Sequence, residues 1–271
     1  MFDSVGFLIE PDELVKLLGG NAVIIDARPY EDFEKGHIPG AVPFSTGDLF
    51  AGDTRLDGLK PFVEAMANRF MIAGVSMDRP VVVYDGDTGA RAARELWMLE
   101  FLGHRNARML HGGFNFWKRV GGPVDLSTEI ATVRTKQIKP SLATGFLAGI
   151  DDVMRRAGTW NYWVIDVRDD AEWAGREGRP CCARRGHVPH AKHIEWTKFL
   201  ESGRFKPPQA IAALLMQQEI NQRHDIALYS HRGARSALAV YALRYAGINS
   251  ARNFIGAWHE WSSRADLPVE A

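Results

Sequence analysis

Residues 226–236 read Ile-Ala-Leu-Tyr-Ser-His-Arg-Gly-Ala-Arg-Ser, a short apolar run followed at once by a polar loop that contains glycine. Residues 81–91 repeat the arrangement as Val-Val-Val-Tyr-Asp-Gly-Asp-Thr-Gly-Ala-Arg. Apolar runs of this length, bounded by turn residues, indicate buried strands. The first residue after the strand is Asp85 in one stretch and Ser230 in the other. These two positions decide which chemistry the chain can perform.

The duplication extends over most of the chain. Residues 24–28 (Ile-Ile-Asp-Ala-Arg) and 36–41 (Gly-His-Ile-Pro-Gly-Ala) recur as residues 164–168 (Val-Ile-Asp-Val-Arg) and 186–191 (Gly-His-Val-Pro-His-Ala). The period of the repeat is 140 residues. Because this is far longer than the unit of a solenoid, each copy is expected to be a domain of its own.

Short apolar runs alternate with stretches of helical period in both copies. The expected strands are residues 21–26, 80–84, 162–166 and 225–229. The expected helices are residues 10–18, 58–69, 91–102, 209–221 and 236–245. Strands that alternate with helices form βαβ units and a mostly parallel sheet, so the expected fold class is α/β.

The repeat also sets the expected domain borders. The first domain is expected over residues 1–126 and the second over residues 142–271. Residues 127–141 between them are polar and have no strong period, which is typical of a linker. Each copy ends in an aromatic box, residues 112–117 and 256–261, which we interpret as core anchors that close each domain.

The composition is that of a globular protein without a dominant charge. The 271 residues include 33 Lys and Arg against 33 Asp and Glu, so no global basic field points to nucleic acid or a membrane surface as a partner. The two cysteines, Cys181 and Cys182, are adjacent, which is no disulfide framework and fits a reducing compartment. Residues 1–10 lack the basic start of a signal peptide, and no apolar run has the length of a membrane span. We therefore expect a cytoplasmic protein.

Four elements recur in the same order in both copies: the Asp-x-Arg strand end, the Gly-His-x-Pro turn, the strand–loop–helix unit and the aromatic box. Together they resemble the rhodanese (sulfurtransferase) family, specifically its tandem two-domain members. The resemblance covers nearly the whole chain. It implies two rhodanese-like domains, each a mostly parallel five-stranded sheet flanked by helices. It also implies a non-catalytic first domain, because Asp85 stands where a nucleophile would be.

In this family the second domain has a Cys at the head of a six-residue loop of the form Cys-x-x-x-x-Arg. The Cys takes a sulfane sulfur from thiosulfate or 3-mercaptopyruvate, becomes a persulfide and passes the sulfur to cyanide or a thiol. The resemblance thus implies a small anionic sulfur donor and a thiol or cyanide acceptor as partners, with no cofactor and no metal ion. The matching loop here has Ser230 at the nucleophile position. The residues assigned to substrate binding are His231, Arg232, Gly233, Ala234 and Arg235.

The residue type at position 230 matters because of where the loop lies. Between a strand end and a helix N-terminus, backbone N–H groups and the helix dipole favour an anion. This setting lowers the pKa of a thiol, whereas a Ser hydroxyl stays protonated without a general base and is not the soft nucleophile that attacks sulfane sulfur. Ser230 is therefore an engineered replacement of Cys, a natural loss, or a sign that another residue serves. The otherwise intact loop favours engineering or a recent loss.

Three other functions compete with sulfur transfer. A Ser–His hydrolase would pair Ser230 with His231, but neighbours in a tight loop usually point apart, and the Gly-x-Ser-x-Gly elbow is absent. A phosphatase of related fold would need a Cys and a loop that is one residue longer. The main alternative is a catalytically inactive pair of domains that binds anions or proteins.

Further candidates lie outside the loop. Asp166 and Arg168 are expected to form a polar brace below it. Family members that use mercaptopyruvate place an Arg shortly after this pair, where this chain has Glu172. Arg176 or Arg179 could substitute for that Arg, and the departure favours thiosulfate as the donor.

The second copy has ten more residues than the first between its Asp and its Gly-His turn, and Cys181 and Cys182 lie in this insertion. Similar two-domain members have a longer segment here, near the mouth of the active site. A second-site or resolving thiol is one interpretation, and two ordinary surface thiols are the favoured one. Adjacent cysteines do not have the spacing of a zinc site. We interpret His37 and His187 as structural residues that fix their turns.

Overall fold

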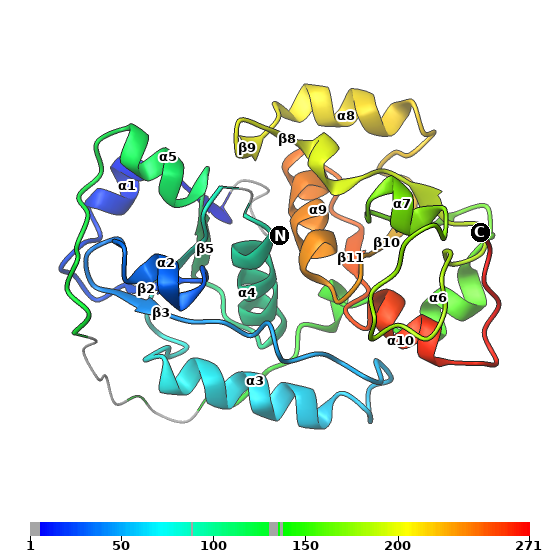
Figure 1. The fold of residues 1–271 in the computed structure, drawn as a ribbon, viewed down its shortest axis with the longest axis horizontal. Helices are drawn as coiled ribbons and strands as arrows, with labels where there is room; N and C mark the ends of the chain where they lie inside the picture. The colour runs from blue at the N-terminus through cyan, green and yellow to red at the C-terminus, as the bar shows by residue number, and fades with distance from the viewer. Residues whose placement is uncertain (1–5, 88, 130–134, 136–137) are drawn as a thin grey trace. The chain divides into compact units, whose positions relative to one another are not determined.

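The structure, a computed structural model, describes residues 6–87, 89–129, 135 and 138–271. The chain divides into two compact units, each with its own sheet and helices (Figure 1). The first unit comprises Met1–Leu49, Phe62–Ala143 and Glu201–Phe205. The second unit comprises Phe50–Pro61, Thr144–Leu200 and Lys206–Ala271. Residues 50–61 thus belong to the second unit although they lie within the first copy of the repeat.

All strands of the five-stranded sheet in the first unit are parallel, in the order β1-β5-β4-β2-β3. The strands are β1 (Leu8–Ile9), β2 (Val23–Asp26), β3 (Ala41–Pro43), β4 (Val81–Tyr84) and β5 (Ala107–Leu110). The helices are α1 (Pro11–Val15), α2 (Tyr30–Phe33), α3 (Lys60–Ile72), α4 (Ala90–Phe101) and α5 (Gly113–Arg119). β2 and β4 are buried along their whole length, which explains why their sequences are continuous apolar runs.

The second unit repeats the central part of this arrangement, with parallel strands in the order β11-β10-β6-β7. The strands are β6 (Tyr162–Asp166), β7 (Lys192–His193), β10 (Asp225–Tyr229) and β11 (Ala251–Asn253). A separate two-stranded sheet pairs β8 (Leu200–Glu201) with β9 (Arg204–Phe205), and residues 201–205 of this pair belong to the first unit. The α-helices are α6 (Ile150–Arg156), α7 (Asp170–Trp173), α8 (Pro208–Met216), α9 (Ala234–Tyr245) and α10 (Ala257–Ser263). Two short 3₁₀ helices are η1 (Thr144–Phe146) and η2 (Trp196–Phe199).

The expected α/β class with two parallel sheets is confirmed, and the two sheets differ at one edge. Where β1 lies in the first unit, the described part of the second unit has a single parallel bridge between Leu147 and Asn253. Residues 147–149 connect η1 to α6 at this edge, and Leu147 forms the bridge.

The central elements follow the sequence pattern closely. The strands expected at residues 162–166 and 225–229 are confirmed with these bounds, and the helices that follow the two polar loops begin at Ala90 and Ala234. Of the expected linker, residues 130–134 and 136–137 lie outside the described residues, as do residues 1–5 of the N-terminal segment. The domain borders drawn from the repeat therefore stay a prediction.

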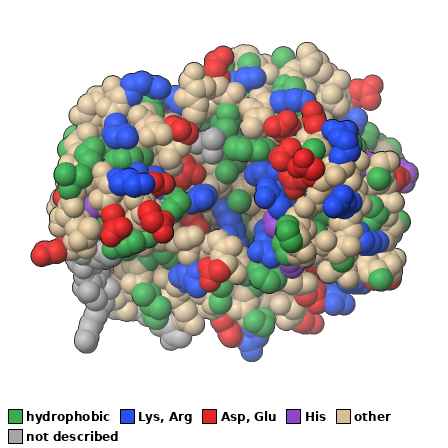
Figure 2. Space-filling view, viewed as in Figure 1, with side chains coloured by type: hydrophobic (Ala, Val, Ile, Leu, Met, Phe, Trp, Pro, Cys, Tyr) green, Lys and Arg blue, Asp and Glu red, His purple; other side chains and the backbone are tan. Residues whose placement is uncertain are grey.

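The surface agrees with the balanced composition. On the face drawn in Figure 2, acidic and basic side chains are interspersed, as expected for equal numbers of the two. Within the described ranges, no helix is both long and apolar enough to cross a membrane.

Candidate active site

The loop that follows β10 lies at the carboxyl end of an interior strand of the second sheet, where parallel sheets place their ligand sites. Gly233 ends the loop as the N-cap of α9, with a φ of 85°. A Cβ at this position would lie 2.3 Å from Cδ1 of Ile255. Both the backbone conformation and the space therefore require glycine here.

Ser230 is held in a closed network of hydrogen bonds. Its hydroxyl oxygen accepts from the Gly233 N–H at 3.2 Å and lies 3.3 Å from the Ser236 hydroxyl. Ser236 donates to Oδ1 of Asn253 at 2.8 Å, and Asn253 donates to the Gly233 carbonyl at 3.1 Å. Ser230 is only 1% exposed, and none of its hydrogen-bond partners in the described structure is a general base. The hydroxyl stabilises the loop rather than acting as a nucleophile.

The aromatic box supports the loop as well as the core. Trp258 and Trp261 are buried, as expected for core anchors. The start of α10 also donates to the loop, because the Trp258 N–H bonds the Ser230 carbonyl at 3.0 Å and the His259 N–H bonds the His231 carbonyl at 3.1 Å. Sequence reasoning missed this second role, because it depends on backbone contacts that carry no residue signature.

Arg235 is engaged by two carboxylates. Its guanidinium lies 2.5 Å from Asp169 and 2.6 Å from Glu172. Burial opposes the ionisation of Glu172, but the hydrogen bond and charge of Arg235 outweigh it and lower the Glu172 pKa to about 2. Arg179, placed beside the site by the sequence, reaches the same carboxylate at 4.0 Å. Arg235 therefore braces the loop against α7, and its charge is already compensated.

Arg232 is the loop cation whose charge is not compensated. Its guanidinium carbon lies 4.4 Å from the ring centroid of Phe50, in the segment of residues 50–61. Its Nε is buried without a hydrogen-bond partner, and Arg232 forms no ion pair within the part of the chain that the structure describes. An anion bound at the loop would meet this charge directly.

The Asp-x-Arg pair of the second unit forms a buried ion pair beside the loop. Arg168 donates to Asp166 at 2.5 Å and to the Gly186 carbonyl at 2.7 Å, and both side chains are almost fully buried. A second hydrogen bond also reaches this turn, because the hydroxyl of Tyr229, the last residue of β10, accepts from the Val188 N–H at 3.1 Å. The brace ties the end of β10 to the Gly-His turn.

The turn histidines have the structural role expected from the sequence. His187 Nδ1 lies 3.0 Å from the Trp173 carbonyl, and its ring stacks on Trp173 with centroids 3.5 Å apart. His37 in the first unit lies 3.1 Å from the Phe33 carbonyl and stacks on Phe33 with centroids 3.8 Å apart.

The corresponding loop of the first unit is filled by its own side chain. The Asp85 carboxylate accepts from the N–H groups of Gly89 at 2.9 Å, Arg91 at 3.0 Å and Ala92 at 3.3 Å. Asp85 is buried, and burial raises its pKa against the effect of these hydrogen bonds. From Asp85 to the N-cap Gly89 the loop is also one residue longer than from Ser230 to Gly233. The built-in carboxylate takes the place of an external anion.

The insertion places its thiols beside the loop of the second unit. Cys181 Sγ lies 3.2 Å from Nε2 of His231, and the ligand atoms of Cys181, Cys182 and His231 all lie within 4.8 Å of one another. Burial, and then the charge of Arg232, lower the pKa of His231 to about 4, so the ring is neutral at pH 7. The sequence showed the thiols but could not show that His231 points to them rather than to Ser230.

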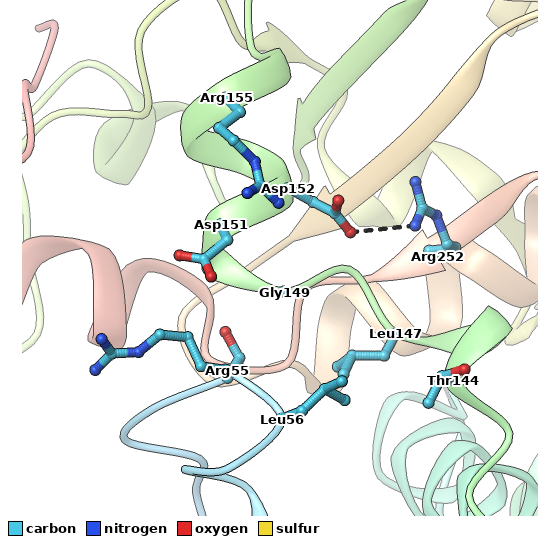
Figure 3. A pocket seen from close by; sticks show the side chains of 10 residues that line it. Arg55, Leu56, Thr144, Leu147, Gly149, Asp151, Asp152, Arg155 and Arg252 are labelled. Atoms are coloured by element: carbon cyan, nitrogen blue, oxygen red, sulfur yellow. Dashed lines mark hydrogen bonds and ion pairs between the residues drawn. The ribbon is translucent and has the colours of Figure 1, made fainter.

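A separate pocket of about 290 Å³ lies where residues 50–61 meet the start of α6 (Figure 3). Its charged side chains are partly paired, since Arg252 lies 3.3 Å from Asp152. The lining residues are Thr54, Arg55, Leu56, Thr144, Leu147, Gly149, Asp151, Asp152, Arg155 and Arg252. It contains no residue of the 230–235 loop, and the sequence gave no sign of it.

The fold and loop just described define a class of protein. The sequence model of the Rhodanese family, whose description is Rhodanese-like domain, matches residues 10–120 and again residues 150–264. The chain therefore belongs to the rhodanese family and has two such domains.

Two relatives of similar length are sulfurtransferases. The chain is 28% identical to the thiosulfate sulfurtransferase of Azotobacter vinelandii over 271 residues, 99% of this chain and 98% of that protein. It is 29% identical to the 3-mercaptopyruvate sulfurtransferase of Escherichia coli K12 over 249 residues, 90% of this chain and 87% of that protein.

Solved structures share the fold. SseA from Escherichia coli, described as a 3-mercaptopyruvate sulfotransferase, has a TM-score of 0.79 at 23% identity and covers 93% of this chain and 98% of its own. The anaerobic ergothioneine biosynthesis enzyme from Chlorobium limicola has a TM-score of 0.85 at 18% identity and covers 100% of this chain and 71% of its own. These two likenesses concern the fold alone.

Proposed function

We propose that the second unit is a sulfane-sulfur transfer site that binds an anionic donor at the 230–235 loop. The observation that carries the proposal is the uncompensated guanidinium of Arg232 beside a loop at a helix N-terminus. The proposal treats the first unit as a non-catalytic scaffold, because the carboxylate of Asp85 already occupies its loop.

The proposed reaction needs a nucleophilic thiol, and the family pattern places it at the position of Ser230. A thiolate there would lie where the Ser230 oxygen now accepts from the Gly233 N–H. It would attack the sulfane sulfur of thiosulfate, the S–S bond of the donor would break, and the electron pair would leave with sulfite. An acceptor thiolate would then take the outer sulfur of the persulfide and release the first thiolate. Arg232 would compensate the charge of the donor and of the departing sulfite.

Thiosulfate is the donor that the charges around the loop favour. Mercaptopyruvate carries a carboxylate, and at the position expected for a carboxylate-binding Arg the chain has Glu172. Arg235 cannot replace that Arg, since it is already paired with Glu172 and Asp169. We also propose a reducing compartment such as the cytoplasm, supported by the two free cysteines.

The Ser230→Cys variant tests the proposal. With thiosulfate and cyanide we expect this variant to produce thiocyanate at a rate well above that of a matched Ser230→Ala variant, and to prefer thiosulfate over mercaptopyruvate. Absence of turnover in Ser230→Cys, together with retained binding of thiosulfate in calorimetry, would favour the alternative of an inactive pair that binds anions. Absence of both turnover and binding would contradict both functions.

A further inference from the structure

His231 directly follows Ser230 in the chain, and its side chain contacts a thiol of the insertion. Cys181 Sγ lies 3.2 Å from Nε2 of His231, the residue directly after Ser230. We infer that Cys181 is the sulfur-carrying thiol of the chain as it stands, with His231 as the hydrogen-bond partner of its sulfur. This inference rests on the proposed function and moves its nucleophile from the head of the loop to the insertion that only the second copy has.

Accessibility separates the two positions. The Ser230 oxygen is buried and bonded within the loop, whereas Cys181 is exposed to solvent. An anionic donor and a thiol acceptor can therefore both reach the sulfur of Cys181 without opening the loop. The charge of Arg232 acts on the His231 ring, because it contributes to the lowered pKa of this imidazole.

The segment that carries the thiol is anchored to the second unit. The Arg184 guanidinium donates to the carbonyl groups of Trp261 at 2.9 Å, Arg264 at 2.6 Å and Leu267 at 2.6 Å. In return, the Arg184 carbonyl accepts from the Trp258 indole N–H at 3.2 Å. These contacts fix Arg184, three residues from Cys181, against α10 and the segment that follows it.

The neutral imidazole suits a sulfur that changes its protonation state. One tautomer of His231 accepts the S–H of a thiol at Nε2, and the other donates an N–H to a thiolate or to the inner sulfur of a persulfide. Cys182 differs from its neighbour, because burial, and then the adjacent Cys181, raise its pKa to about 11. Cys182 therefore stays protonated and does not displace sulfur from Cys181 to form a disulfide.

The reaction at Cys181 balances without a further oxidant or reductant. The thiol first loses its proton to solvent. The Cys181 thiolate forms a bond to the sulfane sulfur of thiosulfate, the S–S bond of the donor breaks, and its electron pair leaves with sulfite. An acceptor thiolate then bonds the outer sulfur, and the electron pair of the broken S–S bond returns to Cys181.

Labelling with thiosulfate that carries a radioactive sulfane sulfur tests the inference. After incubation without acceptor and removal of free donor, peptide mapping of the full chain is expected to place one labelled sulfur on Cys181. The label should be released by cyanide. It should be absent in Cys181→Ser and present in the matched Cys182→Ser variant. In His231→Phe the labelling rate is expected to fall about tenfold, since the sulfur loses a hydrogen bond that stabilises its charged form.

Each contrary outcome has a distinct meaning. If the parent chain takes no label while Ser230→Cys does, Cys181 is not the carrier and the proposed function stands. If Ser230→Cys takes no label either, the proposed function itself fails. Label on Cys182 would overturn the inference. It would also be overturned if the purified chain held stoichiometric zinc and its thiols stayed unreactive until a chelator was added, because the three side chains would then form a metal site.

Discussion

Glu260 provides a test of how residues 50–61 are held on the second unit. Its carboxylate accepts from the backbone N–H of Thr54 at 2.8 Å and from the Thr54 hydroxyl at 2.7 Å. The Thr54 hydroxyl oxygen accepts in turn from the N–H of Ile150. Through Thr54, this carboxylate fixes the segment whose Phe50 lies against Arg232. The segment is therefore expected to respond to the protonation of Glu260.

Burial raises the pKa of Glu260 from its ordinary value of 4.5 to about 7, although both hydrogen bonds from Thr54 oppose the rise. The folded protein thus holds the proton to a higher pH than the unfolded chain. The corresponding stability is fully present below about pH 4.5 and is lost as the pH rises through about 7. A rise of this size corresponds to about 3 kcal/mol of unfolding free energy.

The Glu260→Gln variant removes the titration, while its Oε1 still accepts from the Thr54 N–H and its Nε2 donates to the Thr54 hydroxyl oxygen instead of accepting from it. We expect urea unfolding to give nearly equal free energies for parent and variant at about pH 5, and a variant that is more stable by up to about 3 kcal/mol at about pH 8. Glu260→Ala is the matched control, and it should be less stable at both pH values because the Thr54 donors lose their acceptor. Identical pH dependence in parent and Gln variant would refute the reasoning.

Three further predictions concern the two loops. Asp85→Ala is expected to lower the unfolding free energy by about 2 kcal/mol, because three loop N–H groups lose their acceptor, and added sulfate should restore part of the loss; an equal response of the parent to sulfate would contradict this. In the Ser230→Cys background, Arg232→Met is expected to raise the KM for thiosulfate about tenfold and to weaken its dependence on salt, as measured by steady-state kinetics; an unchanged KM would exclude Arg232 from donor binding. Glu172→Gln is expected to cost about 2 kcal/mol at pH 7, measured by urea unfolding, because Arg235 loses a charged partner. Since the pKa of Glu172 is lowered to about 2, the difference should disappear as the pH falls through that value, and a difference that persists would contradict the assigned ion pair.

The sequence predicted the central part of each domain well because its signals there are local. The apolar run of residues 225–229 and the polar loop after it specify a buried strand and a helix start without reference to distant residues. The repeat with residues 81–84 showed independently that the element is a unit of the fold. The turn histidines were predicted as structural because each begins a Gly-His turn, and in the structure each lies within hydrogen-bond distance of a carbonyl of the preceding helix.

The features that escaped prediction depend on contacts between distant residues. Nothing in residues 50–61 indicates that they belong to the second unit, because their anchor, the carboxylate of Glu260, lies 206 positions from Thr54. The roles of the two loop arginines also could not be separated. Arg232 and Arg235 are alike in sequence, and only the position of Glu172 shows that one charge is compensated and the other is free.

The spacing of Cys181 and Cys182 likewise did not predict a functional role for the two thiols. Adjacent cysteines do not match a zinc pattern, and the expectation that His231 points away from Ser230 did not show that it contacts Cys181. The direction of the His231 ring settles which of the two it contacts. A side-chain direction of this kind depends on the packing of the insertion against the loop, which the local sequence does not specify.

The most direct test of the central claim is the mass of the intact Ser230→Cys chain after exposure to thiosulfate, measured in a background in which Cys181 and Cys182 are both replaced by Ser. We expect a gain of one sulfur atom, which cyanide removes and which the same background with Ser230 retained does not show. An unchanged mass in the Ser230→Cys chain, with its fold intact by circular dichroism, would contradict the claim that the 230–235 loop is a sulfur-transfer site.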